Sequence, residues 1–183
     1  MGRGPSYPYV DLEEAVSLTR KVYDFTKRAP APLAAVVKEA WEYSLTSSSG
    51  EKVLAALKSF GLLDETSSND IKQVRISDRA YRILLDQPDA PERKSALREC
   101  VLAPRWYRYC WETWGKEMPP SMRSSLLFDH RFVESTVDKF LQDYKQSVQF
   151  AGLLSESKDP EKAEDSKTAK DLNLEIGSEV QWE

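Results

Sequence analysis

The sequence predicts a mainly α-helical protein of 183 residues in which one β-hairpin interrupts the helices. The first observation behind this prediction is a short amphipathic helix, residues 48–59, followed by a glycine and then by an alternating segment, Ile71–Ile76. The second is the spacing of apolar residues beyond residue 91, which recur every three or four positions as in helices. A mainly helical fold with a small hairpin therefore fits the whole pattern.

Two further helical patterns precede residue 48. Asp11 marks the start of the first, and Glu13 and Glu14 lie in its first turn, where the helix dipole favours acidic groups. Its apolar stripe recurs at spacings of three and four and consists of Leu12, Ala15, Leu18, Val22 and Phe25. Pro30 and Pro32 then break the chain. A second helix follows, and its expected inner face is Leu33, Val36, Val37, Ala40 and Trp41.

The helix over residues 48–59 carries start and stop signals. Ser48 and Glu51 have the spacing of a capping box, and Gly61 can adopt the left-handed conformation that ends a helix. The residues expected to face the core are Leu54, Leu57 and Phe60. Two helices, a short turn, a capped helix and a hairpin follow the order of a winged helix-turn-helix domain. We predict this domain over residues 11–86.

The segment Gln87–Pro91 is the best candidate linker, and residues 91–154 are predicted as a helical domain. Its last helix, from about Glu134 to Ala151, ends in Gly152-Leu153-Leu154, much as the earlier helix ends in Gly61-Leu62-Leu63. Two interpretations stay open. The region is either a second, degenerate winged helix whose returning strand is residues 171–177, or a plain helical region followed by a largely disordered acidic tail, residues 155–183.

The formal net charge of −4 is unevenly distributed. Residues 155–183 contain nine acidic and four basic side chains, so the remainder of the chain is close to neutral. Nucleic-acid-binding domains usually have a basic excess, and a local cluster would have to supply it here.

The inventory of catalytic residues is thin. His130 is the only histidine, and Cys100 and Cys110, ten positions apart in a helical pattern, are predicted to be small buried residues rather than a disulfide or a metal site. We expect no enzyme activity, no cofactor and no metal. The sequence also contains no apolar run long enough to span a membrane and no signal peptide at its start, so we expect a cytoplasmic protein.

The helix over residues 48–59 and the hairpin form the candidate DNA-binding surface, with the helix in the major groove and the hairpin along the phosphates. The candidate contacts are Ser47, Ser49, Lys52, Ser59, Lys72, Arg75, Arg79 and Arg82. The helix lacks the Arg, Asn or Gln that make bidentate base contacts, so we expect backbone-dominated binding to double-stranded DNA, as in a transcriptional regulator or accessory factor. The alternative is a protein-interaction or assembly module that docks a partner without DNA.

An aromatic cluster between residues 106 and 114 is the candidate partner or dimer interface. Its tryptophans are Trp106, Trp111 and Trp114. Aromatic stripes at helical spacing mostly fill cores, so packing within the chain is the favoured interpretation and a homodimer or protein partner is the alternative.

Several short segments resemble a group of uncharacterised bacterial proteins with an N-terminal winged-helix domain. The matching segments are Pro8–Ala15, Lys21–Tyr23, Ala40–Ser44, Leu57–Leu62, Ile76–Ala80 and Phe140–Leu153. The resemblance implies the fold and a bacterial origin. Because the group is uncharacterised, it implies DNA binding or transcription regulation only by analogy and assigns no functional residue.

Overall fold

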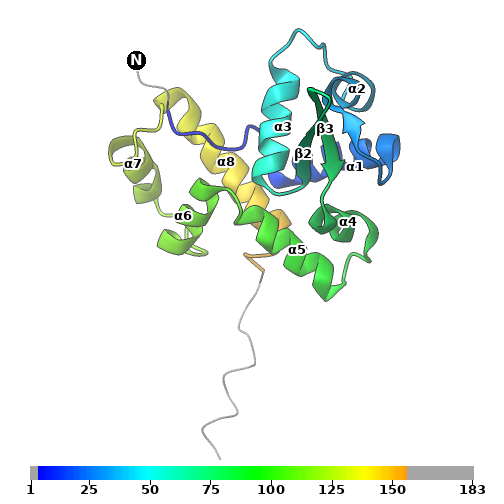
Figure 1. Cartoon of the computed structure of the whole chain (residues 1–183). Helices are drawn as coiled ribbons and strands as arrows, with labels where there is room; N and C mark the ends of the chain where they lie inside the picture. The colour runs from blue at the N-terminus through cyan, green and yellow to red at the C-terminus, as the bar shows by residue number, and fades with distance from the viewer. Residues whose placement is uncertain (1–3, 156–183) are drawn as a thin grey trace, which may run out of the picture.

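The computed structural model describes residues 4–155, which are mainly helical and contain a small three-stranded antiparallel sheet of strand order β1-β3-β2 (Figure 1). The elements are α1 (Leu12–Thr26), β1 (Ala31–Pro32), α2 (Leu33–Ala35), the π-helix η1 (Val36–Ala40), α3 (Ser49–Ser59), β2 (Leu63–Ser68), β3 (Ile71–Ile76), α4 (Asp78–Leu85), α5 (Pro91–Val101), α6 (Arg105–Trp114), α7 (Pro120–Phe128) and α8 (Glu134–Phe150). This confirms the mainly helical class. Apart from Ser155, the predicted acidic tail and its strand at residues 171–177 lie outside the described residues.

The first helix begins as its sequence predicts, but one residue of its expected stripe does not face the core. The Asp11 carboxylate accepts a hydrogen bond of 2.9 Å from the Glu14 N–H and caps α1. Phe25 is 47% exposed, whereas Thr19 is fully buried. Each residue turns about 100° around a helix axis, so the buried stripe is centred closer to Thr19 and leaves Phe25 at its margin.

A short strand replaces the predicted break at Pro30 and Pro32. In β1, Ala31 pairs with Val74 and Pro32 pairs with Gln73. Proline has no N–H to donate to a ladder, and β1 is an edge strand, where that loss is tolerated. The prolines that suggested a break therefore concealed a strand.

The expected inner face of the second helix is largely confirmed, although the helix is a single α-turn continued by a π-turn. Val36, Val37, Ala40 and Trp41 are buried, and Leu33 packs at the edge of the core. The indole N–H of Trp41 donates to the Leu18 carbonyl oxygen at 3.2 Å and so joins this helix to α1.

The predicted start of α3 is wrong, whereas its predicted end is confirmed. Ser48 makes no side-chain capping bond, and its φ of −72° and ψ of −2° are helical, so the predicted capping box is wrong. Gly61 does adopt a positive φ, 73°, and the Leu62 N–H donates to the Leu57 carbonyl oxygen at 2.9 Å. Gly152 ends α8 in the same way, with a φ of 77° and a Leu153 to Val148 bond of 3.0 Å.

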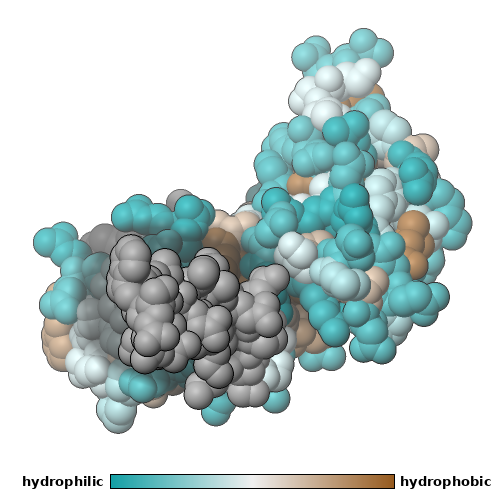
Figure 2. Space-filling model, turned by 90° about the horizontal axis from the view of Figure 1, so that it is seen from below, coloured by the Kyte–Doolittle hydropathy of each residue, from teal (hydrophilic) through white to brown (hydrophobic). Residues whose placement is uncertain are grey.

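The last helix packs against the first, and the buried residues of the described chain form one hydrophobic cluster. The contact between the helices is fixed by the Leu12 N–H, which donates to the buried Ser147 hydroxyl at 2.9 Å. Seen from below, the surface is mostly hydrophilic, with small separate apolar patches (Figure 2). Residues 11–86 and 91–154 thus share a core; their predicted status as separate domains stays a prediction.

Candidate nucleic-acid interface

The β2–β3 hairpin turns next to the N-terminus of α3 (Figure 1). Asn69 and Asp70 make the turn with φ values of 50° and 62°, which is the geometry of a two-residue type I′ loop. Ser68 pairs with Ile71 directly beside the turn. Because Asn and Asp tolerate positive φ better than other non-glycine residues, the local sequence determines this turn.

The ladder places the two candidate basic residues of the hairpin on opposite faces. Side chains alternate along a strand, so Lys72 shares a face with buried Val74, while Arg75 points to the other face. Arg75 lies directly opposite Asp64, with its Nε 3.4 Å from Asp64 Oδ2. Of these two cations, only Lys72 is therefore on the face of the hairpin that also packs into the core.

An ion pair connects this face of the hairpin to α3. The Lys58 ammonium donates to Glu65 Oε2 at 2.7 Å. That hydrogen bond, together with the charges of Lys58 and Lys72, holds the pKa of Glu65 below its ordinary value. Glu65 thus offsets part of the positive charge at the junction of α3 and the hairpin.

Lys52 is on the exposed face of α3, where it meets the N-terminal segment. Its ammonium lies 5.3 Å from the centroid of the Tyr9 ring, and the ammonium of Lys139, from α8, lies 5.8 Å from the same ring. Tyr9 is half exposed. Both ammonium groups therefore stay at the surface, each beside the face of a neutral ring.

The candidate serines are occupied by the backbone or lie at the helix start. The Ser47 hydroxyl donates to the Ser44 carbonyl oxygen at 3.0 Å, and the Ser59 hydroxyl donates to the Ala56 carbonyl oxygen at 2.8 Å. Ser49 is the first residue of α3 and is half buried. Hydroxyls that donate to nearby backbone carbonyls stabilise the local turn and are less available to a ligand.

Arg79 and Arg82 lie on α4, which follows the end of β3 that is remote from the hairpin turn (Figure 1). An Arg79 Nη is 3.2 Å from Glu99 of α5. Both arginines line a hollow of about 400 Å³ that also includes the carboxylates of Asp78, Glu92 and Glu99. The structure therefore separates these two arginines from Lys52 and Lys72, which the sequence had placed in one set.

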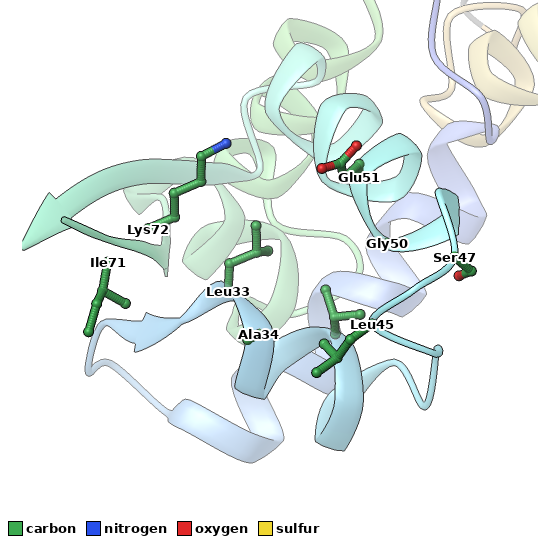
Figure 3. A pocket seen from close by; sticks show the side chains of 9 residues that line it. Leu33, Ala34, Leu45, Ser47, Gly50, Glu51, Ile71 and Lys72 are labelled. Carbon is green, nitrogen blue, oxygen red and sulfur yellow. The ribbon is translucent and has the colours of Figure 1, made fainter.

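A hollow of about 340 Å³ lies between α2, the start of α3 and the hairpin, and it was not anticipated from the sequence (Figure 3). Its rim contains Leu45 and Ile71, which are 59% and 52% exposed. Lys72 and Glu51 lie at the same opening, on the hairpin and on α3. The signal that could have revealed it is Leu45 in an otherwise polar turn, together with Ile71 directly after the polar turn of the hairpin.

Gly50 allows α3 to approach the π-helix closely at this hollow. A Cβ atom at Gly50 would lie 2.8 Å from both Cγ atoms of Val37, closer than side chains tolerate. Because residue 50 has no side chain, α3 and the π-helix can lie this close together. Leu45 lies in the segment that connects these two helices.

The three candidate interface tryptophans are half buried and pack within the chain. Trp106 contacts His130 and Phe132 with ring centroids 5.1 Å and 5.0 Å apart, and Trp114 contacts Tyr109 at 5.7 Å. Trp111 packs against the hydrophobic core. These contacts account for much of the aromatic surface without a second chain.

The two cysteines and the one histidine are the remaining candidate reactive side chains. Cys100 and Cys110 are both buried, as predicted, and burial raises the pKa of each thiol to about 12. His130 Nε2 lies 2.8 Å from the Tyr109 hydroxyl. Within residues 4–155, no group of three or more His, Cys, Asp or Glu side chains could hold a metal ion, and no helix is long and apolar enough to cross a membrane.

Comparison with known proteins adds no relative: no family model, no curated protein and no solved structure matches the chain. The resemblance to uncharacterised bacterial winged-helix proteins therefore stays a prediction.

Proposed function

We propose that residues 11–86 form a winged helix and that this unit binds double-stranded DNA through its phosphate backbone. The supporting observation is the order and pairing of the elements. A helix, an edge strand, a short helix, α3 and a β-hairpin follow one another, and the hairpin pairs with β1 in the order β1-β3-β2. In winged helices the third helix and the hairpin together face the duplex.

The exposed side of α3 and the turn of the hairpin give this surface its charge. Lys52 and Lys72 lie here, Lys58 is paired with Glu65, and Glu51 adds a further negative charge. The balance is only slightly positive, so we expect weak binding that depends strongly on salt and little on sequence. Arg75 contributes less in this proposal because it faces the other side of the hairpin beside Asp64.

The test is the affinity for a short DNA duplex, measured by fluorescence anisotropy as a function of salt concentration. The full chain should bind at low salt, and Lys52→Glu with Lys72→Glu should weaken binding and reduce the slope of log K against log salt by about 2. Arg82→Glu with Lys145→Glu changes the charge equally at exposed positions outside the interface and should leave the slope unchanged. No binding at low salt, or equal losses in both double variants, would refute the proposal.

A second function is favoured by the hollow beside α3, which could accept an apolar side chain from a protein partner. Leu45 and Ile71 expose large apolar surfaces at its rim, and such residues in a concave site are typical of docking surfaces. If partner docking is the function, we expect the chain not to bind DNA at low salt. Leu45→Ser and Ile71→Ser would then abolish capture of the partner, whereas Phe128→Ser, at an exposed phenylalanine of α7, would not.

A further inference from the structure

Helix α5 segregates its charges onto two sides. Glu92, Ser95 and Glu99 line the hollow that α5 shares with α4. Arg93, Lys94 and Arg98 line a different hollow, of about 250 Å³, which α5 shares with the C-terminal end of α8. No acidic residue lies among the residues that line this second hollow, which we call the α5–α8 hollow.

The α5–α8 hollow also has an apolar floor and a fixed basic wall. Leu97 is buried beneath it, and Phe150 forms part of its side. Arg93 is held in place because its Nε donates to the Ile83 carbonyl oxygen at 3.0 Å. That partner is a neutral carbonyl, so the bond orients the guanidinium without cancelling its charge. Lys94 is exposed at the opening.

The described chain ends at this hollow. Ser155 is one of its lining residues, and the next ten residues in the sequence, 156–165, contain five acidic and two basic side chains. Glu156 follows Ser155 directly. An extended chain covers about 3.3–3.6 Å per residue, so Asp159 can reach any part of a hollow of this size. The three basic groups and the acidic segment are therefore adjacent and opposite in charge.

We propose that residues 156–165 bind in the α5–α8 hollow and that their carboxylates pair with Arg93, Lys94 and Arg98. Because the segment is joined to Ser155, its binding is intramolecular and needs only weak individual contacts. Surface ion pairs are screened by salt, so the segment leaves the hollow at high ionic strength.

The test uses the full chain and compares amide chemical shifts in nitrogen–proton NMR spectra. Neutralising the near acids with Glu156→Gln, Asp159→Asn and Glu161→Gln should shift the amides of residues 93–98. The matched control neutralises three acids further along the chain, with Asp171→Asn, Glu175→Gln and Glu179→Gln, and should leave those amides in place. Unchanged α5 amides in the first variant, or equal shifts in both, would overturn the proposal.

A reciprocal measurement starts from the hollow. Lys94→Glu should shift the amides of residues 156–161, whereas Lys38→Glu, an equal charge reversal on the π-helix, should not. About 1 M salt, at which the screening length falls to about 3 Å, should reproduce the effect of Lys94→Glu in the unmodified chain. Amides 156–161 that respond to neither change would show that the segment does not occupy the hollow. This result is independent of DNA binding, because neither Lys94 nor the segment belongs to the proposed interface.

Discussion

The Ser77 hydroxyl donates a hydrogen bond of 2.7 Å to the carbonyl oxygen of Gly61, and the Oγ atom of the same hydroxyl accepts the Ala80 N–H at 3.1 Å. One side chain therefore caps α4 and holds the end of α3 in place. The Ser77 N–H adds a bond of 3.1 Å to the Leu62 carbonyl oxygen. These bonds fix where α3 ends relative to β3, the last strand of the hairpin.

Replacing this hydroxyl should destabilise the fold. Ser77→Ala removes the cap of α4 and the donor to Gly61, and we expect a loss of about 1–3 kcal/mol in the free energy of unfolding. Denaturant unfolding measures it. Ser77→Thr retains a hydroxyl and is the control, with a smaller expected loss. Equal losses in both variants would mean that the volume of the side chain matters and the hydrogen bonds do not.

Gly61 and Gly115 form a natural pair for separating backbone strain from side-chain crowding. Both have positive φ, 73° and 60°, but a Cβ at Gly61 would lie 2.7 Å from Arg79 Nη1, whereas a Cβ at Gly115 would meet nothing within 4 Å. Gly115→Ala should cost about 1 kcal/mol from backbone strain alone. Gly61→Ala should cost more and should also displace Arg79 from Glu99, which thermal unfolding and the Arg79 side-chain NMR signals would report. Equal losses of unfolding free energy in the two variants would contradict side-chain crowding at Gly61.

Gly50→Ala tests the close approach of α3 to the π-helix. The added methyl group would overlap both Cγ atoms of Val37, so we expect a loss of about 1–3 kcal/mol in unfolding free energy. Gly50→Ala combined with Val37→Ala removes the overlapping atoms and should recover part of the loss relative to Val37→Ala alone. A double variant whose losses simply add would show that the two residues do not interact.

Asp143 and Asp138, both on α8, should give opposite dependences of stability on pH. Burial raises the pKa of Asp143, partly countered by its bond to Lys139, whereas the Arg123 hydrogen bond lowers the pKa of Asp138. A raised carboxyl pKa means that the folded state holds its proton more tightly. Stability from this group therefore falls as pH rises above the unfolded value of about 4. The paired Asp138 instead contributes stability above that value, which is lost as pH falls through its lowered pKa.

Asp143→Asn should therefore flatten the decline in stability as pH rises from about 4, and Asp138→Asn should reduce the loss on acidification. Chemical unfolding between about pH 3 and 7 distinguishes the two variants, because they change the slope of unfolding free energy against pH in opposite directions. If both variants changed the profile in the same direction, one of the two assigned environments would be wrong.

Local signals predicted the helices because capping and periodicity act within a few residues. Asp11 caps α1 and Gly61 ends α3 as expected. The same signals failed where a distant partner decided the outcome. β1 exists because β3 pairs with it, and Phe25 is exposed because the buried stripe of α1 is centred nearer Thr19. Ser48 shows that a matching spacing does not make a capping box when the backbone is already helical.

The candidate site, like the fold, could be predicted only in part from local signals. The sequence by itself determined which cations surround α3 and the hairpin, because composition and element order are local properties. Only the tertiary structure decided which of them lie on the same face: the strand register turns Lys72 and Arg75 to opposite faces, and Arg79 of α4 pairs with Glu99. The hollow between Leu45 and Ile71 also exists only in three dimensions. Side-chain direction depends on strand pairing and helix packing, which bring together residues far apart in the chain.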